Sequence, residues 1–239
     1  LSDLAQSFQG IITGRDRVFV MDEEKRKQEK INMHWAVPWI KNKNVQLYCV
    51  IPSNQILLFL DQSSPVYNDE QLLHYLMPFY DDLKKRRECQ TGKIPWYGIQ
   101  WPRQRSLFEQ EKIIFPYKAE KNRFAIDSNH CFFSADIYGL LSNKISLKAL
   151  TVLLNSKLYD FYFKSFAKKL GGNLYEYYPN RVMRLKLPLP GDEFYFHLEC
   201  LYDIIKNSNK IDSLAKRNAD IYIDDFFHLT AQERRIIGE

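Results

Sequence analysis

The sequence predicts an α+β fold in which a mixed α/β region is followed by a helical C-terminal tail. Up to about residue 190, short apolar runs alternate with segments whose apolar residues recur every three or four positions, as strands and helices require. After Gly191 only the helical spacing continues. The 239 residues are 45% hydrophobic, which is enough to bury a core and excludes a disordered chain. We expect one unit over residues 1–190 and a helical extension of the same module over residues 191–239.

Three elements are predicted in the first 60 residues. Residues 10–21, GIITGRDRVFVM, contain a Gly-containing turn before an apolar run, which we expect to form a strand with Phe19 in the core. Residues 22–30 are all polar and of mixed charge, as in a solvated helix or loop. Two apolar runs, 45–51 and 55–60, flank a Pro-Ser-Asn turn and predict a β-hairpin.

A helix and a strand are predicted in the middle of the chain. Residues 69–87 have helical spacing, and Pro78 should kink or restart the helix. Residues 112–116, KIIFP, form a short apolar run that predicts a strand. The apolar face of the predicted helix consists of Leu72, Leu73, Leu76, Tyr80 and Leu83.

Two helices are predicted in residues 146–166, because leucines and aromatic residues recur there at helical spacing. Asn155-Ser156 can cap the second of them. Residues 168–181, KKLGGNLYEYYPNR, contain Gly, Asn and Pro and therefore predict a loop. Residues 182–190, VMRLKLPLP, predict a strand that ends on prolines.

The tail contains three predicted helices. The second spans residues 211–227, and the third begins at a capping box, Thr230-Ala-Gln-Glu233, in which threonine and glutamate satisfy each other's backbone N–H groups. The first has one apolar face, formed by Leu198, Leu201, Ile204 and Ile205.

Composition and motifs exclude several classes of protein. No apolar run approaches the 18 residues that a membrane-spanning helix needs, and no signal peptide is present, so we expect a protein of the cytoplasm. The four cysteines lack the spacing of a zinc site, and no metal is expected. The sequence has no GxGxxG, GxxxxGK[ST], GxSxG or HExxH motif. No cofactor is therefore expected on this chain.

Basic loop residues are the most informative candidates for function. The net charge of +5 is compatible with a polyanionic partner. Arg and Asn can read guanine and adenine edges, while other cations neutralise phosphates. The alternative for each residue is a solvated loop charge, and Asp16 could pair with one of the two arginines beside it. The candidate DNA contacts are Arg15, Arg17, Arg103, Arg105, Lys118, Arg123, Lys168, Lys169 and Asn173.

Two other functions remain open from the residues alone. Asp16, Glu23 and Lys25 loosely match a magnesium-dependent nuclease site, in which two carboxylates hold the metal and a lysine lies near the attacking water. The match falls in a run of charged residues, where chance matches are frequent. Alternatively, the chain is a protein-interaction scaffold that packs through Trp96, Tyr97 and Trp101.

An ordered set of segments resembles the C-terminal target-recognition (specificity) domain of TaqI-type adenine-specific DNA methyltransferases. The same module occurs in fused type IIG restriction-modification enzymes. The resemblance covers nearly the whole chain. The matching segments are GIITG with Phe19, Trp96-Tyr97 with Trp101-Pro102-Arg103, KIIFP at 112–116, LLNSKL with FYF at 153–163, LPLP at 187–190, and the ID, F, LT, E and II positions between Ile223 and Ile237.

The resemblance implies an α+β domain that docks on the major groove of double-stranded DNA and selects its target sequence. Catalysis would belong to a separate N-terminal methyltransferase domain, which binds S-adenosylmethionine and flips the adenine. That domain's Asn-Pro-Pro-Tyr motif is absent from this sequence. The resemblance therefore implies that this chain alone is not an enzyme. Its expected partners are duplex DNA and the methyltransferase domain, in the bacterial cytoplasm.

Overall fold

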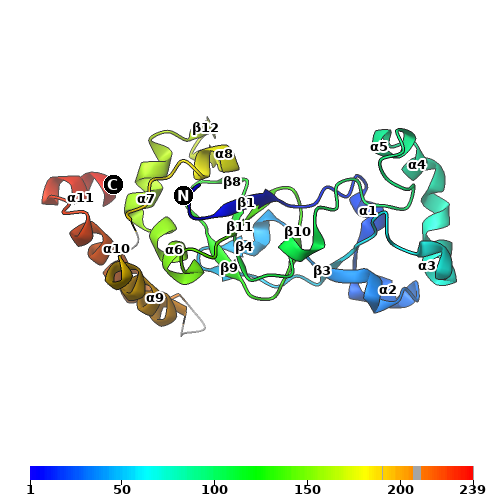
Figure 1. Ribbon diagram of the computed structural model, residues 1–239, viewed down its shortest axis with the longest axis horizontal. Helices are drawn as coiled ribbons and strands as arrows, with labels where there is room; N and C mark the ends of the chain where they lie inside the picture. Colours follow the sequence, from blue (N-terminus) through cyan, green and yellow to red (C-terminus); the bar gives the residue numbers. More distant parts are fainter. Residues whose placement is uncertain (190, 207–210, 239) are drawn as a thin grey trace.

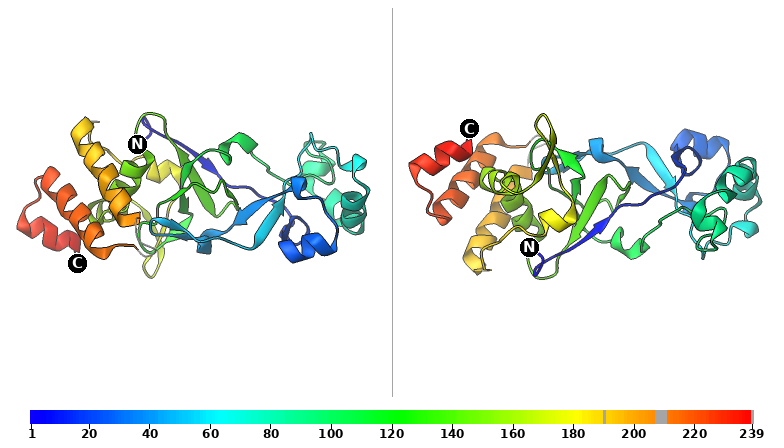
Figure 2. Two further views of the ribbon diagram at one scale, coloured as in Figure 1. Left: turned by 90° about the horizontal axis from the view of Figure 1, so that it is seen from below. Right: turned by 90° about the horizontal axis from the view of Figure 1, so that it is seen from above.

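The structure, a computed structural model, describes residues 1–189, 191–206 and 211–238. The molecule is elongated, with β-sheets in the middle and helices at both ends (Figures 1 and 2). Helices α2–α5 form one end, and α6, α7 and α9–α11 form the other. The predicted α+β class with C-terminal helices is confirmed. The division into a unit over residues 1–190 and a helical extension of the same module over residues 191–239 stays a prediction.

The central sheet has the antiparallel order β1-β11-β7-β9. The KIIFP segment is strand β7, as predicted, and all five of its residues are buried. In β7, Ile114 faces one hydrophobic core, whereas its neighbours Ile113 and Phe115 face a second core. Side chains alternate between the two faces of a strand, so this sheet separates the two cores. Its strands are β1 (Gln6–Gln9), β7 (Lys112–Pro116), β9 (Ala125–Asp127) and β11 (Ile137–Leu141).

A second four-stranded sheet belongs to the core that includes Ile114. Its order is β10-β3-β6-β2, and only the β10–β3 pair is parallel. Gly10, which directly follows β1, packs against the backbone just after β10. A Cβ on this glycine would lie 2.2 Å from the backbone oxygen of Ser134. Only glycine allows the two backbones to approach so closely. The strands are β2 (Val20–Asp22), β3 (Ala36–Ile40), β6 (Gln55–Leu58) and β10 (Phe132–Phe133).

Two smaller sheets complete the β-structure. Strands β12 (Lys168–Gly171) and β13 (Leu174–Glu176) form a hairpin, which adds to β8 (Lys118–Ala119). Strands β4 (Val45–Gln46) and β5 (Cys49–Val50) form a separate two-stranded hairpin.

Eleven helices occur in the described parts of the chain, three of them with only four residues. Helices α1–α5 lie at the end of the molecule next to the second sheet, and α6–α11 lie at the other end (Figure 1). They are α1 (Asp16–Phe19), α2 (Glu23–Gln28), α3 (Glu70–Leu76), α4 (Tyr80–Lys84), α5 (Arg87–Gln90), α6 (Leu147–Leu154), α7 (Lys157–Lys164), α8 (Pro179–Val182), α9 (Asp192–Lys206), α10 (Ser213–Phe226) and α11 (Ala231–Gly238). None of them is long and apolar enough to cross a lipid bilayer.

Several local predictions are confirmed. Pro78 lies in a 3-10 turn that separates α3 from α4. The Ser156 hydroxyl accepts a hydrogen bond from the Tyr159 backbone N–H and caps α7. Glu233 accepts a 2.8 Å hydrogen bond from the Thr230 backbone N–H, while the Glu233 N–H donates to the Thr230 hydroxyl at 3.3 Å, so the capping box forms. The polar run 22–30 is helical over Glu23–Gln28.

Two predictions in the first 60 residues are wrong in part. Asp16–Phe19 is a helical turn, so the predicted strand begins only at Val20, although Phe19 is fully buried as expected. The runs 45–51 and 55–60 do not pair with each other. Tyr48 adopts a left-handed conformation with φ 57°, which turns the chain back within the first run and leaves β6 to pair with β2 and β3.

Three predictions in the C-terminal half are also wrong. Residues 168–181 are not a loop, because β12 and β13 pair across a two-glycine turn. Residues 182–189 contain no strand, since α8 ends at Val182 and irregular chain follows, while Pro190 lies outside the described residues. Ile204 is 52% exposed, because the buried face of α9 runs through Leu198, Leu201 and Ile205 instead.

We predict that the fully buried ion pair between β7 and β9 is required for stability. The Lys112 ammonium lies 2.8 Å from the Asp127 carboxylate and also donates to the Phe108 carbonyl at 2.6 Å. Lys112→Met removes the cation and leaves a buried carboxylate without its partner, so the free energy of unfolding should fall by about 3–5 kcal/mol in urea titrations.

Glu109→Gln is the matched control, because it breaks the half-exposed Arg105–Glu109 pair, and it should cost less than about 1 kcal/mol. Equal effects of the two substitutions would contradict the account of the buried pair.

Candidate nucleic-acid interface

Four of the predicted DNA contacts lie on the sheet that contains the β12–β13 hairpin. Lys168 lies opposite Glu176, and Glu176 lies opposite Lys118 on β8, so the three residues share one face of the sheet. Both lysines are exposed. Gly171 and Gly172 have φ values of 135° and 53° and form the tight turn, which presents Asn173 to solvent. Lys169, also exposed, lies opposite Tyr175 on the other face.

Asn42 connects this sheet to the middle of the molecule. Its side-chain amide donates to the Lys118 carbonyl at 3.5 Å and accepts a 2.9 Å hydrogen bond from Arg123. Burial lowers the pKa of the half-buried Arg123. Arg123 therefore acts mainly by holding Asn42 and its loop in place, and its guanidinium is only partly accessible to solvent. Lys41 and Lys43, on either side of Asn42, extend the positive charge, and the Lys43 side chain is exposed.

Two carboxylates bind the cations of the next segment: Asp16 binds Lys41, and Asp82 binds two arginines. The Lys41 ammonium lies 2.6 Å from the Asp16 carboxylate. Burial acts to raise the pKa of Asp16, but hydrogen bonds from Lys41 and Thr13 bring it below its usual value. Arg15 and Arg17 both bind Asp82 of α4, at 3.1 and 2.5 Å. Asp82, and not Asp16, is thus the carboxylate that holds the two arginines.

A buried arginine keeps this arginine-containing turn against α4. Arg86 is 6% exposed and donates to the carbonyls of Leu83 at 3.0 Å, Thr13 at 3.4 Å and Trp96 at 2.7 Å. Burial lowers the pKa of Arg86, and its guanidinium also lies 5.6 Å from the centre of the Phe19 ring. Three chain segments are therefore fixed by one side chain.

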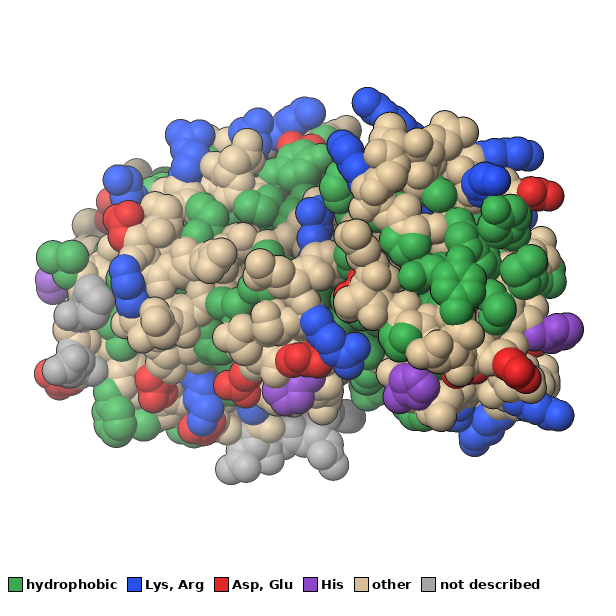
Figure 3. All heavy atoms as spheres, turned by 45° about the vertical axis from the view of Figure 1, so that its right-hand side comes forward, with side chains coloured by type: hydrophobic (Ala, Val, Ile, Leu, Met, Phe, Trp, Pro, Cys, Tyr) green, Lys and Arg blue, Asp and Glu red, His purple; other side chains and the backbone are tan. Residues whose placement is uncertain are grey.

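These residues form a continuous surface that we call the basic strip. Figure 3 shows several Lys and Arg side chains along the upper edge of one face of the molecule. Figure 1 places β12, which carries Lys168 and Lys169, at that edge. Such a surface attracts a polyanion and can follow a phosphate backbone. The basic strip consists of Lys168, Lys169, Asn173, Lys118, Arg123, Asn42, Lys41, Lys43, Arg15 and Arg17.

Three tyrosines lie beside the hairpin end of the basic strip. The rings of Tyr117 and Tyr138 lie 5.0 and 6.1 Å from the ring of Tyr178, which is 39% exposed. A hydrogen bond with Tyr178 contributes most to raising the pKa of Tyr117 to about 12, and burial adds to it. Tyr117 also donates to the Glu176 carboxylate at 3.4 Å. The cluster gives the strip an aromatic surface next to its lysines.

The two remaining predicted contacts occupy different surroundings. Arg103 has φ 63° and donates to the Gln9 side chain at 2.9 Å, and it lies close enough to Tyr138 to counteract the rise in that tyrosine's pKa caused by burial. Arg105 pairs with Glu109 and lies over the rings of Phe59 and Phe132. Among the described residues, no contact joins Arg105 to the basic strip.

The nuclease hypothesis gains no support from the geometry. Asp16 pairs with Lys41, and Glu23 pairs with Arg26 at 2.5 Å on α2. Lys25 lies over the Tyr75 ring. Each member of the predicted set thus has a different partner. The described ranges also contain no group of three or more His, Cys, Asp or Glu residues that could hold a metal ion.

The three aromatic residues of the scaffold hypothesis are mainly structural. Tyr97 is 8% exposed and belongs to the core. The Trp96 indole donates to the Tyr67 hydroxyl at 3.0 Å. Trp101 is 39% exposed and lines a cavity of about 340 Å³ with Pro102.

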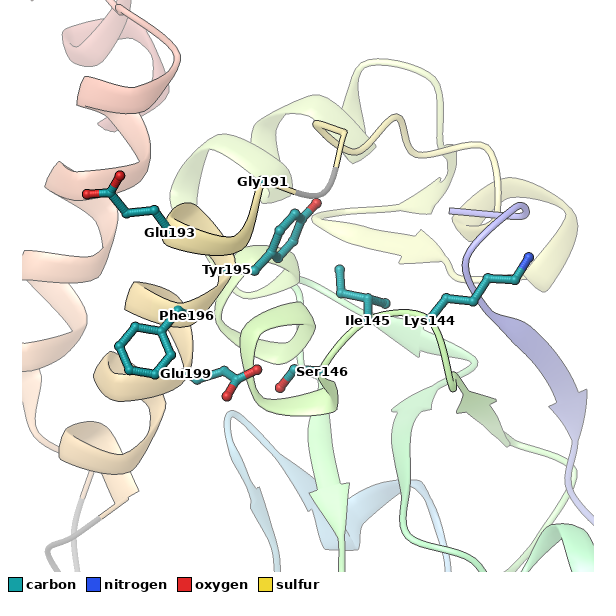
Figure 4. A pocket seen from close by; sticks show the side chains of 8 residues that line it. All are labelled: Lys144, Ile145, Ser146, Gly191, Glu193, Tyr195, Phe196 and Glu199. Atoms are coloured by element: carbon teal, nitrogen blue, oxygen red, sulfur yellow. The ribbon is translucent and has the colours of Figure 1, made fainter.

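A cavity at the opposite end of the molecule has an acidic lining. It measures about 510 Å³ and lies between the start of α6 and helix α9. Figure 4 shows the Glu199 carboxylate close to Ser146, while Glu193, nearer the start of α9, points away from Ser146. The lining also contains Lys144, and the excess of one carboxylate over this ammonium disfavours a phosphate there.

The sequence did not point to several residues of this interface. Lys41, Asn42 and Lys43 follow a strand in a short loop, and no local pattern separates them from ordinary solvated residues. Asp82 falls within a helix that was assigned from its apolar spacing alone. The alternation of Arg15, Asp16 and Arg17 was the one local pattern that suggested an ion pair, but it pointed to Asp16 as the partner and not to Asp82.

A model of the TaqI-like C-terminal specificity domain matches residues 84–189. The chain is also 21% identical over 219 residues to the type II methyltransferase M.BstVI of Geobacillus stearothermophilus, an alignment that covers 89% of this chain and 38% of the relative.

Two solved structures share the fold. The type IIL restriction-modification enzyme MmeI in complex with DNA superposes with a TM-score of 0.69 at 13% identity, over 95% of this chain and 33% of MmeI. The type IIG restriction endonuclease BpuSI gives a TM-score of 0.54 at 12% identity, over 96% of this chain and 31% of BpuSI. The chain thus spans about a third of the length of the proteins that it matches.

We predict that Arg86→Met loosens the arginine-containing turn. The substitution leaves the Thr13 and Trp96 carbonyls without their charged donor and should lower the free energy of unfolding by about 2–3 kcal/mol. Backbone amides of residues 13–17 should exchange with deuterium faster than in the unsubstituted chain.

Arg87→Met at the exposed neighbouring position is the control, for which we expect little change in either measurement. Unchanged exchange at residues 13–17 in the Arg86 variant would show that this side chain does not hold the turn.

Proposed function

We propose, from the premise that residues 84–189 carry a TaqI-like C-terminal specificity domain, that this chain recognises the target DNA sequence for a restriction-modification methyltransferase. The observation that supports this most is the basic strip, which runs from the β12–β13 hairpin to the paired arginines of α1. The strip offers exposed lysines for phosphates and hydrogen-bonded Arg and Asn side chains for base edges.

The proposed division of labour places catalysis outside this chain. The chain spans 38% of the length of M.BstVI, and the sequence has no GxGxxG turn or Asn-Pro-Pro-Tyr segment. In the proposal, a methyltransferase domain binds S-adenosylmethionine and modifies an adenine in the bacterial cytoplasm, while this chain selects the site. The chain alone should transfer no methyl group from S-adenosylmethionine to duplex DNA, which a radiolabel assay measures. Transfer by the chain alone would contradict this division.

We predict a salt-dependent affinity for duplex DNA. If the five lysines of the strip contact phosphates, the association constant should fall by about 500-fold between 50 and 200 mM salt. The measurement is a titration of a fluorescent duplex at several salt concentrations. An absent or salt-insensitive affinity of the full chain would contradict the proposed function.

Lys168→Gln tests the hairpin end of the strip. Loss of one phosphate contact should reduce the slope of log affinity against log salt by about 1 and weaken all duplex sequences equally. Lys27→Gln on α2, also exposed but at the lower edge of Figure 1, is the control and should leave the slope unchanged. Equal slopes for the two variants would place the DNA elsewhere.

A further inference from the structure

The two arginines bound to Asp82 differ in how many of their donors are occupied. Arg15 uses all three guanidinium nitrogens, since Nε and Nη2 donate to Asp82 at 3.1 and 3.3 Å and Nη1 donates to the Gly14 carbonyl at 3.0 Å. Arg17 donates only through Nη2, at 2.5 Å. Its side chain is 69% exposed, compared with 41% for Arg15. All three guanidinium nitrogens of Arg15 are thus occupied within the protein, so its role is structural. With respect to the described residues, Arg17 still has free guanidinium N–H groups that can donate to a ligand.

The charges around Arg17 disfavour a phosphate as its ligand. Asp16 lies next to Arg17 in the chain, and Asp82 contacts its guanidinium. Both carboxylates would repel a phosphate at this point. Hydrogen bonds from Arg15 and Arg17 lower the pKa of Asp82, so that carboxylate keeps its charge at neutral pH. A base edge with two acceptors carries no net charge and is repelled much less.

The orientation of Arg17 is set before any ligand binds. Asp82 restricts the guanidinium, and Arg86 holds α4 against the turn that carries Arg17. A planar fork restricted in this way loses little entropy when it forms two parallel hydrogen bonds. In the major groove, guanine presents two acceptors, N7 and O6, to one arginine.

We propose that Arg17 reads a guanine in the major groove and that Asp82 is the residue that positions it. The inference rests on the proposed function and deepens it, because it assigns base selection to one residue among the cations of the strip. Arg15 then supports the site by binding the same carboxylate, and the exposed lysines of the strip supply contacts to phosphates that are independent of sequence.

The test is selection from a library of random duplexes by the full chain. The unsubstituted chain should enrich a sequence that contains a guanine. Arg17→Ala should lose preference at one G·C pair, with discrimination there reduced about 5- to 150-fold and other positions unchanged. Arg17→Lys keeps the charge but not the fork, and it should lose the same preference while retaining most of the overall affinity.

Asp82→Asn should relax preference at the same base pair, whereas Arg217→Ala on α10, exposed and at the other end of the molecule, should leave the selected sequence unchanged. A uniform loss of affinity in Arg17→Ala, or no change, would overturn the inference. Relaxation by Arg17→Ala but not by Asp82→Asn would overturn the positioning role. If the unsubstituted chain enriches no sequence, the proposed function itself fails.

Discussion

The sheet β1-β11-β7-β9 is buried on both faces, and the arrangement of the two ends of the molecule depends on it. Alternate residues of β7 enter different hydrophobic cores, so neither end can shift without exposing one face of the same strand. The cost of placing a lysine in such a strand is offset by its ion pair with Asp127 and by two carbonyl oxygens. This shared wall gives the hairpin end and the arginine end of the basic strip a fixed spacing.

At the arginine end, a network of hydrogen bonds and ion pairs fixes the positions of the exposed cations. The Arg86 guanidinium donates hydrogen bonds to three backbone carbonyls, and among the described residues it contacts no carboxylate. It thereby fixes the Thr13 turn against α4, and this brings Arg15 and Arg17 to Asp82. At the hairpin end, by contrast, the lysines are exposed. A surface with one rigid and one adaptable end suits a partner that combines a specific feature with a repeating charged backbone.

Much of the fold could be predicted from local patterns, and the failures have physical causes. KIIFP, the Pro78 break and the Ser156 cap depend on burial, backbone geometry and a single hydrogen bond, which neighbouring residues determine. The hairpin partners of residues 45–60 depend instead on Tyr48 adopting a positive φ, which aromatic residues seldom do. For the site, residue chemistry selected basic loop residues as candidates, and their contact with DNA stays a prediction. It could not show that Asp82, 65 residues from Arg17, would bind it, or that Arg105 would lie over Phe59 and Phe132.

Hydrogen–deuterium exchange of the full chain with and without saturating duplex DNA tests the central claim most directly, namely that the basic strip is the surface that meets DNA. The account predicts slower exchange in segments 14–17, 41–43, 118–123 and 168–173, with α9 and α10 unchanged. Protection confined to α9 and α10, or to the acidic cavity beside α6, would contradict it.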